Sequence, residues 1–186
     1  MEKDRYFYKN TFHHLYNRGA NKLPVFFDRN DYLFFLRRIR VFKQKYEISI
    51  LCYCLMPNHF HLFVQQLSDE FPIGKFISDL INSYTKSINK KYKRSGVLFQ
   101  GRTSSKLIDQ QEYFIWLTKY ILLNPVKSKL VPCAHNWEFS SAKDYFGIRK
   151  GNLIDNNEIM SNFSSKEEFR DFIESSEEKY DYSKFK

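Results

Sequence analysis

The chain has 186 residues, a length that allows one domain with an extensive core and does not favour two domains of ordinary size. Lysine and arginine exceed aspartate and glutamate by 30 − 21 = 9, and 18% of the residues are aromatic, so the composition modestly favours nucleic acid as the partner. The three cysteines argue against a secreted disulfide framework. Without an apolar signal core or a membrane-length apolar run, the sequence predicts a cytoplasmic protein with no membrane partner.

The first half of the chain predicts three strands and one helix. Residues 11–18 are typical of a strand, and Asp28 is the expected N-cap of a helix. The apolar positions of this helix recur at intervals of three and four, at Tyr32, Phe35, Leu36, Ile39 and Phe42. Residues 48–55 and 59–65 predict two further strands, antiparallel to each other. Cys52 and Cys54, on the first of these two strands, are expected to be small buried residues.

The second half predicts a helix that starts at Pro72, a strand at residues 103–108 and a helix at residues 111–124 that Pro125 ends. The order β-α-β-β-α-β followed by a helix predicts an α+β fold with a ferredoxin-like sheet. Many unrelated functions share this fold, so it does not identify the chemistry.

The C-terminal part of the chain is expected to pack on the same domain. The sequence is expected to form a main domain, residues 1–131, and a helical extension, residues 132–186. Short helices are expected at residues 140–145 and 166–175, and the last residues are expected to be disordered.

Two histidines are the sharpest chemical feature of the sequence. His59 and His61 stand two apart in a predicted strand, so they project from the same side, while the residues between and after them face the core. Two neutral imidazoles side by side form half of a metal site. The alternative is a pair of ordinary polar residues on a half-exposed strand, and the spacing alone favours this alternative.

A tyrosine and an asparagine near the end of the last predicted helix form the second feature. Tyr120 and Asn124 are four residues apart and therefore share one face of the helix. Asn124 can offer an amide oxygen to a hard cation, and Tyr120 carries a nucleophilic hydroxyl group. Spacing alone favours the alternative, in which Tyr120 is a core aromatic residue.

Taken together, these motifs resemble a known family. Met-Pro-Asn-His-Phe-His at residues 56–61, with Tyr-Ile-Leu-Leu-Asn-Pro-Val at residues 120–126, resembles the HUH single-tyrosine transposases of insertion sequences. The nearest branch is the REP-associated tyrosine transposases, with further matches at residues 16–19, 99–102 and 137–145. The resemblance runs from about residue 11 to about residue 160. It departs from the family at Leu122, where a histidine is frequent, and at Ser128, where an alanine is frequent.

The resemblance implies a metal-dependent endonuclease and strand transferase that acts on single-stranded or hairpin DNA, with residues 1–131 as its catalytic domain. His59, His61 and Asn124 would hold Mg²⁺ or Mn²⁺. Tyr120 would attack the scissile phosphate, giving a 5′-phosphotyrosine and a free 3′-hydroxyl. The family implies either a monomer or a homodimer.

Several residues are candidates for DNA contacts, and several other functions stay open. The candidates are Asn17, Arg18, Gln100, Arg102 and Lys106; for each basic side chain among them, a solvated surface charge is an equally good interpretation. The alternative functions are a hairpin-binding module that no longer cuts, a replication-initiator-like HUH nickase, and an unrelated metal hydrolase that uses the two histidines.

Overall fold

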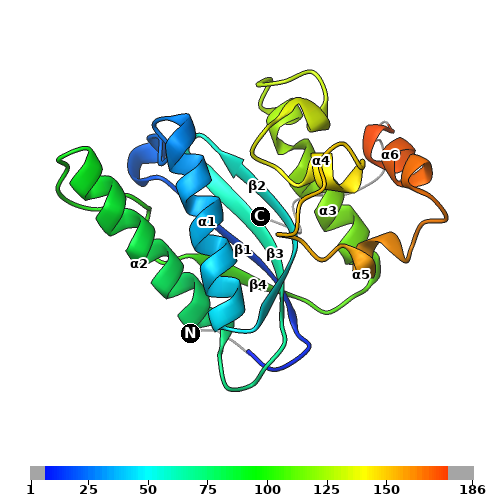
Figure 1. Cartoon of the computed structure of the whole chain (residues 1–186), viewed down its shortest axis with the longest axis horizontal. Helices are drawn as coiled ribbons and strands as arrows, with labels where there is room; N and C mark the ends of the chain where they lie inside the picture. The colour runs from blue at the N-terminus through cyan, green and yellow to red at the C-terminus, as the bar shows by residue number, and fades with distance from the viewer. Residues whose placement is uncertain (1–6, 176–186) are drawn as a thin grey trace.

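A four-stranded sheet lies between two groups of helices in the structure, a computed structural model that describes residues 7–175 (Figure 1). Its elements in chain order are β1 (Phe12–Arg18), η1 (Ala20–Lys22), α1 (Arg29–Lys45), β2 (Ile48–Met56), β3 (His59–Gln66), α2 (Ile73–Lys91), β4 (Ser104–Ile108), α3 (Glu112–Lys127), η2 (Ala134–Asn136), α4 (Ala142–Tyr145), α5 (Asn157–Met160) and α6 (Lys166–Glu174). The disorder predicted for the last residues concerns a stretch that lies outside the described part. Within that part, no helix is both long and apolar enough to cross a bilayer.

The strands follow the order β2-β3-β1-β4, and every neighbouring pair is antiparallel. Helices α1 and α2 follow β1 and β3, so the predicted α+β fold with a ferredoxin-like strand order is confirmed. In the register, Tyr16 of β1 stands opposite His61 of β3, and His14 stands opposite Lys106 of β4. Side chains of directly paired residues point to the same face, so these four share one face of the sheet.

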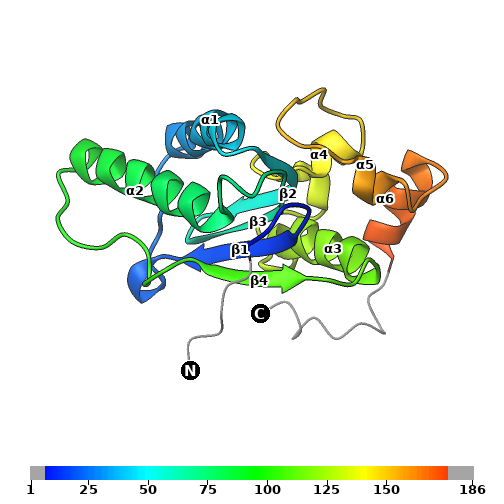
Figure 2. The ribbon, with the colours of Figure 1, turned by 90° about the horizontal axis from the view of Figure 1, so that it is seen from below.

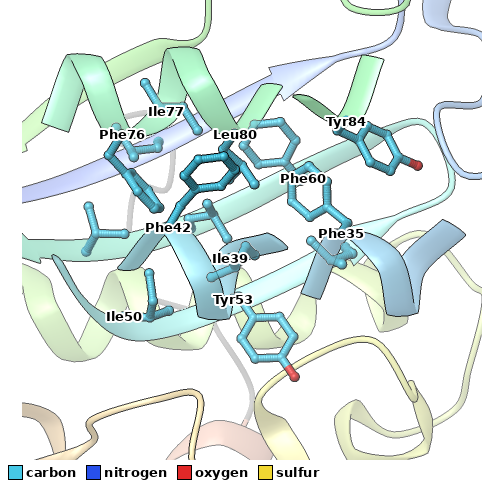
Figure 3. Packing of buried hydrophobic residues seen from close by; sticks show 14 of the residues in the cluster. Phe35, Ile39, Phe42, Ile50, Tyr53, Phe60, Phe76, Ile77, Leu80 and Tyr84 are labelled. Carbon is cyan, nitrogen blue, oxygen red and sulfur yellow. The ribbon is translucent and has the colours of Figure 1, made fainter. Parts of the chain in front are cut away.

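The other face of the sheet carries a large apolar core that α1 and α2 cover side by side (Figures 2 and 3). Phe60, Leu62 and Val64 of β3 are fully buried in this core, as the alternation in the sequence predicts. Helix α1 begins at the predicted N-cap, because the Asp28 carboxylate accepts a hydrogen bond from the backbone nitrogen of Asp31 at 3.0 Å. The side chain of Asp31 returns the bond to Asp28, which completes a capping box.

Helix α3 and the C-terminal segment, residues 132–175, cover the face that carries the two histidines (Figure 1). Cys52 and Cys54 are buried there as free thiols, as predicted. Trp137 donates its indole hydrogen to the carbonyl of Leu55 at 2.9 Å, so its polar edge is engaged in the fold. Because both faces are covered, a polar side chain on β3 needs partners inside the protein.

Helix α3 continues past the predicted stop at Pro125 and ends at Lys127. The prediction was wrong because a proline removes only one backbone donor, whereas the surrounding contacts hold the turn in place. Pro125 is buried, and the backbone nitrogen of Ser128 donates to the carbonyl of Asn124 at 3.0 Å. The helix therefore extends beyond Asn124 and places Lys127 near Asn124.

Lys119 fastens α6 to α3 from a buried position. Its ammonium group donates to the carbonyl of Phe172 at 2.6 Å, and to the carbonyl and hydroxyl oxygens of Ser175 at 3.1 and 2.8 Å. These carbonyls belong to the end of α6, where the last carbonyl groups of a helix lack internal donors. Only 1% of Lys119 is exposed, so these bonds replace the water that a lysine ordinarily keeps.

His13 makes the stability of the fold depend on pH. Its ring nitrogens lie 3.1 and 3.2 Å from the hydroxyl oxygens of Ser105 and Thr11, and burial lowers the pKa of His13 from 6.5 to about 4. Between these two values only the unfolded chain takes up a proton at this position, so the free energy of unfolding falls as the pH drops. In urea denaturation between pH 6.5 and 5, His13→Gln should reduce this dependence by up to about 1.4 kcal/mol per pH unit. An unchanged dependence would contradict the assignment.

Candidate active site

A cavity of about 650 Å³ lies where β1 and β3 meet α3, within the usual size range of ligand sites. Strand and helix residues together form its lining. The less exposed part is made of Tyr16, His59, His61, Tyr120 and Asn124, and the exposed rim includes Arg18, Gln100, Arg102, Lys127 and Ser128. The fold thus brings the four residues of the predicted catalytic and metal sites into one cavity, next to three basic side chains.

The turn after β1 fixes the start of β3. The backbone nitrogen of Gly19 donates to the carbonyl of Asn58 at 2.8 Å. A Cβ atom at Gly19 would lie 2.0 Å from the carbonyl oxygen of Leu23, so only glycine fits here. This contact sets the position of His59, the residue that follows Asn58.

His59 has one ring nitrogen held by the protein and one that faces Asn124. The amide of Asn58 donates to the carbonyl of Lys22 at 2.9 Å, so its Oδ1 is the atom that lies 2.7 Å from Nδ1 of His59. An amide oxygen only accepts, so His59 carries its proton on Nδ1 and keeps a lone pair on Nε2. Burial is the main cause that lowers the pKa of His59 to about 4, so the ring is neutral at pH 7.

His61 is bound to a third histidine beneath it. Its Nδ1 lies 2.9 Å from Nε2 of His14, and the two rings stack with centroids 5.1 Å apart. Burial lowers the pKa of His61 well below 6.5, and the neighbouring His14, His59 and Arg18 lower it further. The ring of His59 stands perpendicular to that of His61 at a centroid distance of 5.2 Å. Two neutral imidazoles therefore meet at the cavity.

The Asn124 amide is oriented by its own helix. Its Nδ2 donates to the carbonyl of Tyr120 at 2.9 Å, and a carbonyl can only accept, so Oδ1 is left to face His59. Oδ1 of Asn124 lies 3.4 Å from Nε2 of His59, a long distance for a hydrogen bond. The two atoms are placed as neighbouring acceptors that share no proton.

This set of donors fits a divalent cation. Two imidazole nitrogens and an amide oxygen suit Mn²⁺, or Mg²⁺ with additional water ligands. Two neighbouring ligands of an octahedral ion lie about 3 Å apart, close to the 3.4 Å between His59 and Asn124. Within residues 7–175, no group of three or more histidine, cysteine, aspartate or glutamate side chains could hold a metal. A centre built from three such side chains, which a hydrolase could use, is therefore not found in that range.

Tyr120 lies beside His61, with its ring perpendicular at a centroid distance of 5.5 Å. Burial raises the pKa of the Tyr120 phenol above 10, while the hydrogen bond with Asn124 and the charge of Arg18 act in the opposite direction. The phenol is therefore protonated at neutral pH. A reaction that uses its oxygen as a nucleophile must remove this proton or stabilise the phenolate.

Of the residues predicted to contact DNA, three lie on the rim of the cavity and one lies outside it. Arg18, Gln100 and Arg102 lie on the exposed rim. Lys106 points to the same face of the sheet but lies two residues along β4 from Ser104, which lines the cavity, and Lys106 does not line it.

Asn17 holds the loop that carries Arg102. Its amide nitrogen donates to the carbonyl of Gly101 at 3.3 Å and to the hydroxyl of Thr103 at 3.2 Å, and its oxygen accepts from the backbone of Arg18. The side chain of Asn17 thus positions the rim from within the protein.

His14 and Lys127 also belong to this site, although no motif in the sequence indicated them. His14 alternates with Tyr16 and Arg18 along β1, and this period of two is the signal that places them on one face. Lys127 stands seven residues, or about two turns, after Tyr120 on α3. Its ammonium nitrogen lies 5.6 Å from the centroid of the Tyr120 ring, so a cation is close to the phenol.

Comparisons with known proteins agree on one family. Residues 8–123 match the family model described as Transposase IS200 like. A Haemophilus influenzae protein named as a REP-associated tyrosine transposase is 27% identical over 108 residues, 53% of this chain and 61% of that protein. The match thus spans about six-tenths of the length of this curated relative.

A solved structure shows the same fold. It is described as a REP-associated tyrosine transposase bound to a REP hairpin, and it superposes with a TM-score of 0.69. The match covers 83% of this chain and 94% of that chain at 17% identity, so it bears on the fold alone. Since the family model covers more than half of the sequence, the chain belongs to the IS200-like transposase family.

Proposed function

We propose that this protein is a metal-dependent single-stranded DNA endonuclease and strand transferase that works through a 5′-phosphotyrosine on Tyr120. One observation carries the proposal. The Tyr120 phenol shares a cavity with His59, His61 and Asn124, whose imidazole nitrogens and amide oxygen are ligand types that suit Mg²⁺ or Mn²⁺. A nucleophile, a metal site and a basic rim in one cavity are the parts that phosphoryl transfer requires.

His59, His61 and Asn124 would hold the cation, which when bound polarises the phosphate as a Lewis acid. The Tyr120 oxygen attacks phosphorus and loses its proton, and the bond from phosphorus to the 3′-oxygen breaks. The released strand leaves as a 3′-hydroxyl after taking up a proton. One phosphodiester replaces another, so a second 3′-hydroxyl can reverse the step without ATP.

The rim would hold the phosphates on either side of the bond that is cut. Arg18, Arg102 and Lys127 are exposed there and carry positive charge, which is the usual recognition of a nucleic-acid backbone. Burial disfavours the Tyr120 phenolate, whereas the positive charge of Arg18 favours it by lowering the pKa of the phenol. A nearby positive charge is one means of helping the Tyr120 phenol to lose its proton.

The proposed substrate is a DNA hairpin with an adjacent single strand. The solved relative is described as bound to a REP hairpin, and the basic rim suits a polyanion of this kind. Both α3 and the strands of the cavity belong to one chain, so a single copy contains every residue assigned to the reaction.

A labelled hairpin oligonucleotide with a single-stranded flank tests this function. With Mn²⁺, a label at the 3′ end should move with the protein on a denaturing gel, whereas a 5′ label should be released on a fragment with a 3′-hydroxyl. A chelator should prevent both. Tight binding without an adduct would favour a hairpin-binding module, and cutting without an adduct would favour a hydrolase. An adduct that carries the 5′ label would contradict the proposed linkage.

A further inference from the structure

His14 lies beneath the metal site, outside every motif that indicated the function. It is fully buried, and its Nε2 lies 2.9 Å from Nδ1 of His61. Its ring also lies near the rings of Tyr16 and Tyr120, at centroid distances of 4.8 and 6.2 Å. No surface of His14 is exposed to solvent, so a water molecule could not take its place beside His61 without repacking.

The short contact between His14 and His61 allows two arrangements of one proton. If Nδ1 of His61 donates to Nε2 of His14, then Nε2 of His61 has a lone pair. If Nε2 of His14 donates instead, His61 must carry its own proton on Nε2 and cannot bind a cation there. The protonation site of His61 therefore depends on its partner.

We propose that His14 is a positioning residue of the metal site, whose Nε2 accepts the Nδ1 proton of His61 and keeps the Nε2 lone pair of His61 available to a cation. A histidine ligand usually donates its second N–H to a carboxylate, a carbonyl or water, which fixes the ring and its protonation site. His59 uses the amide oxygen of Asn58 for this purpose. His61 uses a third imidazole. The inference rests on the proposed function, because it assumes that His61 is a ligand.

The Mn²⁺ affinity of the protein without DNA tests the role of His14. His14→Phe keeps a flat ring in the stack but removes the acceptor. We expect it to raise the dissociation constant for Mn²⁺ by about 10- to 100-fold. His14→Gln places an amide oxygen near the position of Nε2 and should retain an affinity close to the wild-type value. The affinity of each variant is measured by titration, with the electron paramagnetic resonance signal of free Mn²⁺ as the readout. Circular dichroism checks that each variant folds.

Nitrogen-15 NMR of the metal-free protein supplies a readout that packing alone would not change. In the wild type and in His14→Gln, the proton of His61 should lie on Nδ1. In His14→Phe it should move to Nε2, because Nδ1 has lost its acceptor. Either an unchanged affinity or an unchanged protonation site in His14→Phe would overturn the inference, and so would equal losses of affinity in both variants.

Failure of the proposed function gives a different result. If the wild-type protein binds no Mn²⁺, with or without hairpin DNA, the metal site itself is wrong and the role of His14 is overturned with it. If the wild type binds Mn²⁺ and His14→Phe binds equally well, only the role of His14 is wrong.

Discussion

Tyr120→Phe is expected to abolish the covalent protein–DNA adduct and to lower strand cleavage by about 10⁴- to 10⁶-fold, the loss typical when an enzyme nucleophile is removed. The phenylalanine ring can keep the perpendicular contact with His61, so the metal site and the fold should persist. Denaturing gels of a 3′-labelled hairpin oligonucleotide measure the adduct, and Mn²⁺ titration confirms that the site is intact.

Two other tyrosines provide matched comparisons for this prediction. Tyr113 lies on the same helix but outside the cavity, so Tyr113→Phe should leave the amount of covalent adduct unchanged. Tyr16 lies in the cavity on the strand side, with its ring 6.1 Å from that of His61. An adduct that persists in Tyr120→Phe and is lost in Tyr16→Phe would assign the nucleophile to Tyr16 and contradict the proposal.

Lys119→Met is expected to lower the free energy of unfolding by about 2–3 kcal/mol, because the buried Lys119 ammonium group is the charged donor to oxygens at the end of α6. Three oxygens at the end of α6 accept from this ammonium group, and the Phe172 carbonyl accepts in addition from the Ser175 hydroxyl. Methionine restores the apolar length of the side chain and avoids burying a charge, so the loss should stay below that of a broken buried ion pair. Urea denaturation followed by circular dichroism measures the change.

Lys86→Met on the exposed side of α2 serves as the control for Lys119→Met, with an expected change within about 0.5 kcal/mol. An equal effect of the two substitutions would mean that Lys119 does not hold α6 in place. Limited proteolysis of the two variants should give the same ranking, with earlier cleavage in the C-terminal segment of Lys119→Met.

Local patterns in the sequence predicted most of the fold. The alternation of Phe60, Leu62 and Val64 identified the buried side of β3, because the two faces of a strand follow a strict period of two. The same rule placed His59 and His61 on the other face, and the four-residue spacing of Tyr120 and Asn124 placed them on one helix face. All four line the same cavity.

The contacts that depend on register and on long-range packing could not be predicted. His14 meets His61 only because Tyr16 pairs with His61, and nothing within β1 alone specifies that alignment. The stop predicted at Pro125 failed because the proline is buried and the following turn still closes with the hydrogen bond from Ser128 to Asn124, although local propensity disfavours it. The hydrogen bonds of Lys119 to the end of α6 could not be predicted either, because its partners lie more than fifty residues later in the sequence.

The neighbouring residues Lys119 and Tyr120 tie the same turn of α3 to two different bodies, the C-terminal helix and the sheet. These contacts on both sides oppose an outward swing of α3 while Tyr120 carries a DNA strand. Under the proposed chemistry, the anchored DNA end would therefore stay where it was cut, and the incoming 3′-hydroxyl would have to travel to it. The exchange of partners would be a motion of the nucleic acid over a stationary protein.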